Sequence, residues 1–463
     1  MSRRRRKPKP ILAHVAPTPA PPPELADEAP LLMRLEREVE DRYRPQMLAA
    51  LGERIGLLEH EGAGTAPRCQ DCGCAMRARG RRPSSFITRF GKVKLRPATY
   101  RCRRCRRQEQ PLLQRLGVEV GRVSGGLARL LALLGVVVPY QLAARLAQLF
   151  FGTEVSPMTV WRAVQRLGEA CEQYTEQQAR FCGDPNQAPT GPAVGPAAVV
   201  LGVDGCALGM QVRAHRRRRQ GSTPLPPLPP VEDGHFREVK TGVLLLPAER
   251  VEPTPGRRSV VRRALVTCLG EADRIFDRLW AKLHEMAWLG PDTVVVIVAD
   301  GAEWIWNRAT MFPKRCEILD FWHAVEKAWE FGRLRWGQES SVTARWAHRL
   351  AEDLRAGKVK EVIARLQTLS VSTAEERELL DGLIRYYTTN QNRMRYDEYL
   401  RLGYGIGSGA VESAHKQVVH ARMRQAGMRW SEAGARRLLA LRVLLLNDQW
   451  SFLERLTMKP LAA

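Results

Sequence analysis

Two CxxC pairs constrain the fold of this chain more than any other feature of its sequence. Cys69 and Cys72 form the first pair, Cys102 and Cys105 form the second, and 29 residues separate the pairs. Two such knuckles supply four thiolates, which can bind one tetrahedral Zn²⁺. The residues between them alternate in polarity as a β-hairpin does. The spacing therefore predicts a zinc ribbon over residues 66–115, and a chance cluster of reduced thiols is the alternative.

Basic residues are concentrated in the same segment. The formal net charge of the 463-residue chain is +24. Residues 68–107 contain fourteen Lys or Arg and one acid, Asp71. This density of positive charge is typical of proteins that contact DNA phosphates, although a ribosome-associated or non-specifically adhesive protein is also compatible with it. We expect double-stranded DNA to be the partner.

Neither the first residues of the sequence nor its apolar runs indicate secretion or a membrane. The opening MSRRRRKPKP is charged but has no apolar run behind it, so it does not resemble a signal peptide. No uninterrupted apolar run approaches the roughly 18 residues of a membrane span. The ten cysteines then indicate a reducing compartment, with thiols and metal ligands rather than disulfides. We expect a cytoplasmic, nucleoid-associated protein without a membrane partner.

Composition divides the rest of the chain into segments. Before the first strand-like run the sequence predicts a disordered basic and Pro-rich arm at 1–30, a helix with a self-association role at 31–65, a helix-turn-helix region at 120–182 and a linker at 183–196. Strand-like runs rich in β-branched residues lie between 197 and 321, with a helix expected at 258–288. Further on, the pattern predicts helices at 322–401 and again within 402–450. We interpret the Arg- and Pro-rich insert at 213–234 as a loop.

The helix-turn-helix candidate is YQLAARLAQLFFGTEVSPMTVWRAVQRLGEA. Ser156 is a plausible N-cap of its second helix, and Pro157 suits the first turn. On that helix we expect four side chains to face a DNA major groove: Thr159, Arg162, Gln165 and Arg166. A helical hairpin that only packs against its neighbours is the alternative.

Three carboxylates stand out by their surroundings: Asp204 follows a strand-like run, Asp300 ends another, and Glu412 follows a Gly/Ser turn in a basic segment. Three such acids can hold two divalent cations that carry out a displacement at phosphorus. Carboxylate oxygens suit Mg²⁺, so we predict a site with two Mg²⁺, or Mn²⁺ in their place. Around Glu412, the cationic residues expected to bind DNA phosphates are Lys416, Arg422 and Arg424. Turn-capping aspartates and a helix-end glutamate remain the alternative on spacing alone.

The acidic blocks together resemble those of a known family. Asp204-Gly205, ADGAEWIW and GSGAVESAHKQVVHARMR are similar to the three blocks of DDE transposases of bacterial insertion sequences. The nearest resemblance is to the ISKra-type family, allied to the mutator-like transposases. In DFWHAVEKAWE, Asp320-x2-His323 is similar to a signature that follows the second aspartate in the mutator-like group. The resemblance covers roughly residues 66–450.

This resemblance implies a multidomain α/β protein with an RNase H-like catalytic core, whose parts at 197–321 and 402–450 are separated by an all-helical insertion at 322–401. It implies a transposase that binds the ends of its element, cleaves DNA with Mg²⁺ and joins the 3′-OH to target DNA as a homodimer or larger oligomer. Asp320 and His323 would position the scissile phosphate or a metal-bound water, or form a structural pair. The alternatives are a zinc-dependent DNA-binding regulator without catalysis, and an RNase H-like nuclease or resolvase.

Six of the eleven tryptophans lie between Asp300 and Glu412. Aromatic rings could stack on distorted DNA bases. We favour packing among the insertion helices for most of them. They are Trp304, Trp306, Trp322, Trp329, Trp336 and Trp346.

Overall fold

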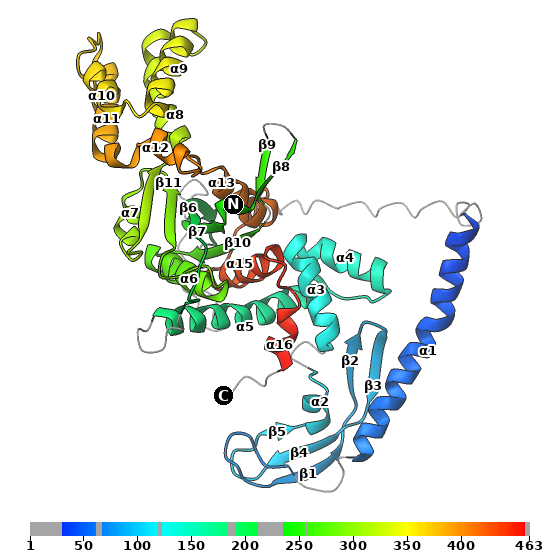
Figure 1. Ribbon diagram of the computed structural model, residues 1–463. Coiled ribbons are helices and arrows are strands. Elements are labelled where there is room, and N and C mark those ends of the chain that lie inside the picture. Colours follow the sequence, from blue (N-terminus) through cyan, green and yellow to red (C-terminus); the bar gives the residue numbers. More distant parts are fainter. Residues whose placement is uncertain are drawn as a thin grey trace, which may run out of the picture. The chain divides into compact units, whose positions relative to one another are not determined.

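The computed structural model describes residues 30–61, 67–118, 123–183, 191–211, 235–254, 257–260 and 262–458. The predicted arm, apart from its last residue, and the loop predicted at 213–234 lie outside the described residues. The chain divides into two compact units, residues 1–116 and residues 117–463. Each unit is described by itself below, with element labels as in Figure 1.

The first unit contains a long helix, five short strands and a short helix. In chain order these are α1 (Leu31–Glu61), β1 (Met76–Arg81), β2 (Ser84–Thr88), β3 (Gly91–Leu95), β4 (Ala98–Cys102), β5 (Gln108–Glu109) and α2 (Pro111–Arg115). β4 pairs antiparallel with both β1 and β5, while β2 and β3 form a hairpin. Phe86 and Val93 are partners in that hairpin and both are buried. Leu48 of α1 lies against Gly91, so the helix covers the hairpin.

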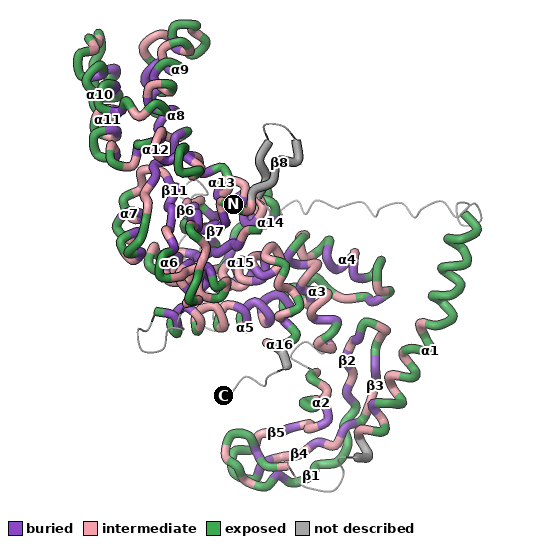
Figure 2. The backbone as a smooth tube through the Cα atoms, viewed as in Figure 1, coloured by how far each residue is buried: buried purple, intermediate pink, exposed green. Residues whose placement is uncertain are grey.

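A five-stranded mixed sheet organises the second unit. Its strands are β6 (Ala198–Gly209), β7 (Phe236–Leu245), β10 (Arg263–Leu269), β11 (Val294–Ala299) and β12 (Arg315–Leu319), in the order β10-β7-β6-β11-β12. β7 is antiparallel to β6 and β10 is antiparallel to β7, whereas β11 is parallel to both β6 and β12. Figure 2 shows buried residues along β6 and β11. Such continuous burial explains why these strands have unbroken apolar sequences.

The helix expected at 258–288 is wrong in its first half. Residues 263–269 form β10, and the helix, α6, is shorter (Ala272–Glu285). The run RALVTCL has buried side chains from Ala264 to Leu269, so this strand is covered on both faces although it lies at the end of the strand order. A separate two-stranded ribbon, β8 (Arg250–Thr254) and β9 (Arg257–Val260), precedes it.

Helices from before and after the sheet pack together. They are α3 (Gly125–Val137), α4 (Tyr140–Phe151), α5 (Pro157–Gly183), α15 (Glu432–Leu446) and α16 (Phe452–Met458). α5 contacts α3, α6 and α15. At Gly168 a Cβ atom would lie only 2.5 Å from the backbone oxygen of Arg437, so this glycine permits the close crossing of α5 and α15. The region predicted as a helix-turn-helix therefore belongs to the same compact unit as the sheet.

The segment between β12 and the last part of the chain is helical. It comprises α8 (Phe321–Trp336), α9 (Ser341–Arg355), α10 (Val359–Gln367), α11 (Ala374–Asn390) and α12 (Tyr396–Arg401), followed by α13 (Gly409–His415), a π-helical turn (Lys416–His420) and α14 (Ala421–Met423). Trp336 and Trp346 lie between α8 and α9 with ring centroids 5.2 Å apart. Trp322 differs from the other five tryptophans of the cluster because it is 62% exposed. α7 (Glu303–Ala309) connects β11 to β12. Among the described residues, no helix is both long enough and apolar enough to cross a membrane.

Candidate functional site

Asp204 and Asp300 lie at corresponding positions of two neighbouring parallel strands. In the register of β6 and β11, Gly202 pairs with Val298. Asp204 lies two residues further along β6, and Asp300 directly follows the last residue of β11. Side chains alternate between the faces of a sheet, so both carboxylates point to the face that carries Gly202 and Val298. The two acids therefore lie on one face of the sheet on neighbouring strands, and their role as metal ligands stays a prediction.

The glycine after each aspartate is required by a close neighbour. A Cβ atom at Gly205 would overlap the carboxylate of Glu238, and a Cβ atom at Gly301 would overlap the ring of Tyr386. Each of the two aspartates also accepts a backbone hydrogen bond from a following residue, at 2.6 Å for the first and 3.0 Å for the second. The glycines therefore let neighbouring side chains close around the carboxylates, and the backbone bonds orient them.

The two aspartates affect each other electrostatically. Burial raises the pKa of Asp204, and the negative charge of Asp300 adds to this rise, while the N–H of Gly205 and the ring of His415 oppose it. Two carboxylates in partly buried surroundings repel each other. A divalent cation between them would relieve that repulsion, so the donor set fits a hard metal ion.

Helix α13 runs beside β6 and brings Glu412 to the same region. A Cβ atom at Gly202 would lie 3.5 Å from Val411 of α13. Glu412 is exposed, and it lines a cavity of about 550 Å³ together with Gly202, Val298 and Trp322. Glu412 thus opens on a cavity that reaches the sheet at Gly202 and Val298, and neither aspartate is among the residues that line it. Within the described part of the chain the oxygens of the three acids are not all within 4.8 Å of one another.

Asp320 and His323 form a pair at the start of α8. The side chain of Asp320 is fully buried, and it caps the helix by accepting hydrogen bonds from the N–H groups of Trp322 at 2.6 Å and His323 at 3.3 Å. It also accepts one from the N–H of Ser408 at 2.7 Å. Nδ1 of His323 lies 3.3 Å from this carboxylate, and the pairing with Asp320 raises the pKa of His323 to about 9. The charge of Asp300 contributes to that rise. A protonated His323 therefore interacts with Asp300 as well as with Asp320.

Ser408 does not cap α13. It occupies the position before the helix, but its hydroxyl makes no capping hydrogen bond and has no partner among the described residues. Its backbone N–H bonds to Asp320 instead. The loop before Glu412 is therefore fixed by a residue from the start of the helical insertion.

Sequence reasoning missed His415, which lies one turn after Glu412 on α13. Its exposure is 4% and neither ring nitrogen has a hydrogen-bond partner among the described residues. Its Nε2 is 3.8 Å from a carboxylate oxygen of Asp204. Burial lowers the pKa of His415, which the carboxylate and the backbone carbonyl of Asp204 oppose in part. The i, i+3 spacing from Glu412 is the sequence signal that could have identified it.

The four residues expected to read a DNA groove are not all available on the surface. Arg162 is exposed and Thr159 is half-buried, but Arg166 is half-buried and Gln165 is only 7% exposed. The expectation for Gln165 is wrong because α15 packs over this part of α5, where Nη1 of Arg437 lies 3.4 Å from its amide oxygen. The predicted cap is present: the N–H of Thr159 donates to the hydroxyl of Ser156 at 3.2 Å.

Of the cationic residues expected to bind phosphates near Glu412, Lys416 and Arg424 are exposed. Arg422 is not available for this role because it is 1% exposed. Its Nε donates to the carbonyl of Gly135 at 3.0 Å, and its guanidinium lies 5.0 Å from the ring centroid of Tyr140. Arg422 therefore joins α14 to the end of α3 rather than facing solvent.

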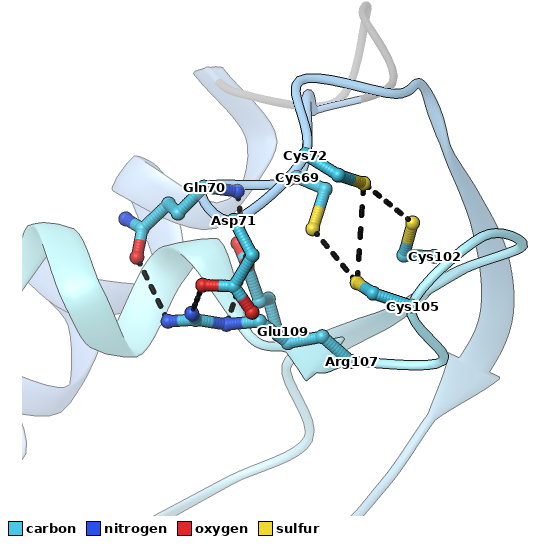
Figure 3. Close-up of polar contacts among 8 residues, drawn as sticks. All are labelled: Cys69, Gln70, Asp71, Cys72, Cys102, Cys105, Arg107 and Glu109. Carbon is cyan, nitrogen blue, oxygen red and sulfur yellow. Dashed lines mark hydrogen bonds and ion pairs between the residues drawn. The ribbon is translucent and has the colours of Figure 1, made fainter.

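The four predicted zinc ligands come together in the first unit (Figure 3). The sulfur atoms of Cys69, Cys72, Cys102 and Cys105 all lie within 4.8 Å of one another. The three closest pairs are 3.3, 3.4 and 3.9 Å apart. A tetrahedral Zn²⁺ with Zn–S bonds of about 2.3 Å requires sulfur atoms about 3.8 Å apart. The thiol cluster therefore fits one zinc ion.

The two knuckles have the same backbone conformation. The residue after the second cysteine of each, Gly73 and Arg106, has a positive φ, 69° and 61° respectively. Arg107 then ties the knuckles together: its guanidinium pairs with Asp71 and Glu109 and donates to the side chain of Gln70 (Figure 3). The predicted cluster thus has a supporting set of charged partners next to the sulfur ligands.

Twelve of the fourteen Lys or Arg in residues 68–107 are exposed. Asp71 is committed to Arg107, so no acid of this segment neutralises the others. The ribbon therefore presents a basic surface suited to a polyanion.

The chain matches no protein-family model, and it matches no protein whose function has been curated. Among solved structures it is similar to the "Drosophila P element transposase strand transfer complex", at 10% sequence identity and a TM-score of 0.33, over 70% of this chain and 92% of that chain. At this level of similarity the match carries no argument about residues or activity, and the conclusions below depend on the site itself.

Proposed function

We propose that this protein is a DDE-type DNA transposase of an insertion sequence, similar to the ISKra-type family. The observation that carries the proposal is the placement of three acids. Asp204 and Asp300 lie at corresponding positions of adjacent parallel strands, and Glu412 lines a cavity over the same sheet face. A regulator that only binds DNA has no need for such an arrangement.

The order and direction of the strands also support the proposal. The first strand, β6, is central, two antiparallel strands continue on one side of it and two parallel strands lie on the other. We expect this arrangement of an RNase H-like core. The helices from α8 to α12 then correspond to an insertion between the second acid and the last one.

Asp204, Asp300 and Glu412 would hold the two Mg²⁺ or Mn²⁺ ions, which would supply activation of the attacking oxygen and stabilisation of the leaving oxygen. The residues of the chain provide the surroundings. Exposed Lys416 and Arg424 bind the phosphates of a DNA strand that enters the cavity. Asp320 fixes the loop before Glu412.

Cationic groups near the acids can bind the DNA phosphates, while the acids themselves would hold the metal ions. His323, with a pKa of about 9, is protonated at neutral pH, so it can donate to a phosphate oxygen beside Asp300. The zinc ribbon supplies a second, sequence-independent set of phosphate contacts on the first unit. Zinc itself holds the ribbon in shape.

A strand-transfer assay tests the proposal. The purified protein is incubated with Mg²⁺ or Mn²⁺, with DNA that flanks its own gene as the donor and a supercoiled plasmid as the target. We expect joined products whose junctions map to the ends of the element. Asp204→Asn, Asp300→Asn and Glu412→Gln should each abolish them, whereas Glu339→Gln, which changes an exposed acid in the turn after α8, should not.

The same assay separates the alternatives. Cleaved donor without joined target would indicate a nuclease or resolvase. Binding without cleavage at any metal concentration would indicate a regulator and would contradict the proposal. Joining that persists in Asp204→Asn would show that these acids are not the catalytic set.

A further inference from the structure

His415 is an unexplained group in the candidate active site. A buried imidazole normally has a hydrogen-bond partner for each nitrogen. His415 is 4% exposed and neither of its nitrogens has such a partner among the described residues. Its distance of 3.8 Å from Asp204 is too long for a hydrogen bond. The ring is therefore buried beside Asp204, whose carboxylate and backbone carbonyl both act on it, but no contact has the geometry of a regular hydrogen bond.

The position of His415 is set by helix geometry. Residues three apart on a helix lie on the same side, about 5–6 Å apart, so Glu412 and His415 both face the strand ends. On α13, Val411 lies over Gly202 and His415 beside Asp204. The helix and β6 thus run side by side, and the four-residue step along α13 matches the two-residue step along β6.

A Glu-x-x-His pair that projects from one helix toward further carboxylates is a recurrent way of holding transition metals in helical proteins. The elements differ here, because strand carboxylates stand in for the second helix, but the donor types, carboxylate oxygen and imidazole nitrogen, are the same. Among the described residues, His415 and two further such donors are not all within 4.8 Å of one another, so the ligands would have to close around the ion. The π-helical turn that follows directly, Lys416–His420, is a rare feature that is frequent at functional sites.

We infer that His415 is a metal ligand beside Asp204, and that the site consequently takes Mn²⁺ in preference to Mg²⁺. This inference rests on the proposed function, since it concerns the cations of the same site. Mg²⁺ is bound almost entirely by oxygen and keeps several waters. Imidazole nitrogen suits later first-row metals better, while carboxylates suit Mn²⁺ as well as Mg²⁺. A mixed nitrogen and oxygen set therefore selects against Mg²⁺.

The other charged groups near His415 do not explain its burial. Glu238 and Arg424 both influence the ring. The carboxylate of Glu238 is paired with Lys240, and Nη1 of Arg424 donates to Nε2 of His420 at 3.0 Å. The carboxylate of Asp204 remains, 3.8 Å from Nε2 of His415.

The direct test is electron spin-echo spectroscopy of Mn²⁺ bound to the full chain without DNA. The protein is first loaded with zinc, so that the four-sulfur site is filled and contributes no nitrogen signal. We expect nitrogen coupling to the bound Mn²⁺ in the unchanged protein and its loss in His415→Gln, which keeps a side chain of similar size. His348→Ala removes an exposed imidazole of α9 and should leave the coupling intact.

Affinities give a second readout. In titrations with Mn²⁺ alone and with Mg²⁺ alone, we expect tighter binding of Mn²⁺ to the unchanged protein. His415→Gln and His415→Ala should weaken Mn²⁺ binding by at least about tenfold, because even residues that only orient a ligand cost that much when changed. The affinity for Mg²⁺ should change far less. Circular dichroism of the zinc-loaded variants verifies that they are folded. If His415→Ala is not folded, the comparison uses His415→Gln alone.

Several results would overturn the inference. Mn²⁺ without nitrogen coupling in the unchanged protein, equal affinities for the two metals, or unchanged Mn²⁺ affinity in a folded His415→Gln variant would each show that His415 is not a ligand. Strand transfer that still requires Asp204 in those circumstances would leave the proposed function standing. Failure of strand transfer together with intact nitrogen coupling would instead contradict the proposed function alone.

Discussion

The backbone N–H of Ser408 donates a hydrogen bond of 2.7 Å to the carboxylate of Asp320, 88 residues earlier in the chain. This bond joins the start of the helical insertion to the loop that leads into α13. It makes Asp320 a positioning residue for Glu412, because the same carboxylate also caps α8. The insertion therefore begins and ends at one buried carboxylate.

Asp320→Asn should destabilise the second unit strongly. The amide group cannot accept all the hydrogen bonds that the carboxylate accepts, and one hydrogen bond to a charged group usually contributes about 1.5–3 kcal/mol. Urea unfolding should show a loss of at least this size. Ser340→Ala, which removes a single capping bond from α9, should cost only about 1 kcal/mol. Equal losses in the two variants would show that the link to Ser408 contributes nothing.

Because His323 pairs with Asp320, the stability of the protein should fall as the pH becomes alkaline. The pKa of His323 is raised from 6.5 to about 9, chiefly by its interaction with Asp320. A raised pKa means that the folded state binds the proton more tightly, so the stabilisation is complete below 6.5 and is lost as the pH rises through about 9. Below pH 6.5 the melting temperature of the unchanged protein should exceed that of His323→Gln. Above about pH 9 the two melting temperatures should approach each other. A difference that stays constant across the range would mean that His323 does not titrate in this way.

Asp204→Asn should not destabilise the fold when divalent cations other than zinc are absent. Burial raises the pKa of Asp204, with a contribution from Asp300, so the charged form is disfavoured in the folded state. The neutral amide should therefore melt at the same temperature as the unchanged protein or higher at neutral pH. With Mn²⁺ present the order should reverse, because only the carboxylate gains from the cation. A lower melting temperature of Asp204→Asn in the absence of the cation would indicate a structural role for this acid.

Removal of zinc should unfold the ribbon but not the sheet unit. In this small module, the binding of one Zn²⁺ by four thiolates would contribute directly to the free energy of folding. Cys72→Ser should lose the metal, measured by atomic absorption, and lose the β-structure of residues 67–118. Cys74→Ser is the matched control, since Cys74 lies next to the cluster without belonging to the four-sulfur group. Zinc lost from Cys74→Ser and kept in Cys72→Ser would overturn the ligand assignment.

The affinity for DNA should fall steeply with salt concentration. Arg103 and Arg104 are exposed in the second knuckle, and each phosphate contact contributes about 0.9 to the slope of log affinity against log salt. Changing both to Ala should reduce that slope by about 1.8, while replacing the exposed Glu339 by Gln should not change it. An unchanged slope would place the ribbon's basic surface away from DNA.

The sequence predicted local features well and packing poorly. The two knuckles and the cap at Ser156 depend on short spacings, and each lies where those spacings placed it. Asp300 directly follows β11, whereas β6 continues past Asp204 to Gly209. Gln165 and Arg422 were misjudged because a helical pattern tells which side chains share a face, but not that α15 or α3 will cover that face. His415 was missed for a related reason: its role depends on Asp204, 211 residues away in the sequence, and on the register between α13 and β6. β10 was taken as part of a helix because its apolar run has no period that distinguishes a buried strand from a buried helix.

Two buried arginines limit where the protein can be truncated, because each has a hydrogen-bond acceptor far away in the sequence. Arg422 donates to the carbonyl of Gly135 and Arg442 to that of Val136, both in the last turn of α3. A fragment that begins at the first strand of the sheet would lose both acceptors. Arg422 would lose its backbone acceptor, and Arg442 would keep only its bonds to the carbonyls of Gln417 and Val418. The smallest fragment that retains the cavity lined by Glu412 should therefore begin before α3 and not at the linker that precedes β6. For the same reason, a ligand that shifts α3 would also shift the segment that follows Glu412.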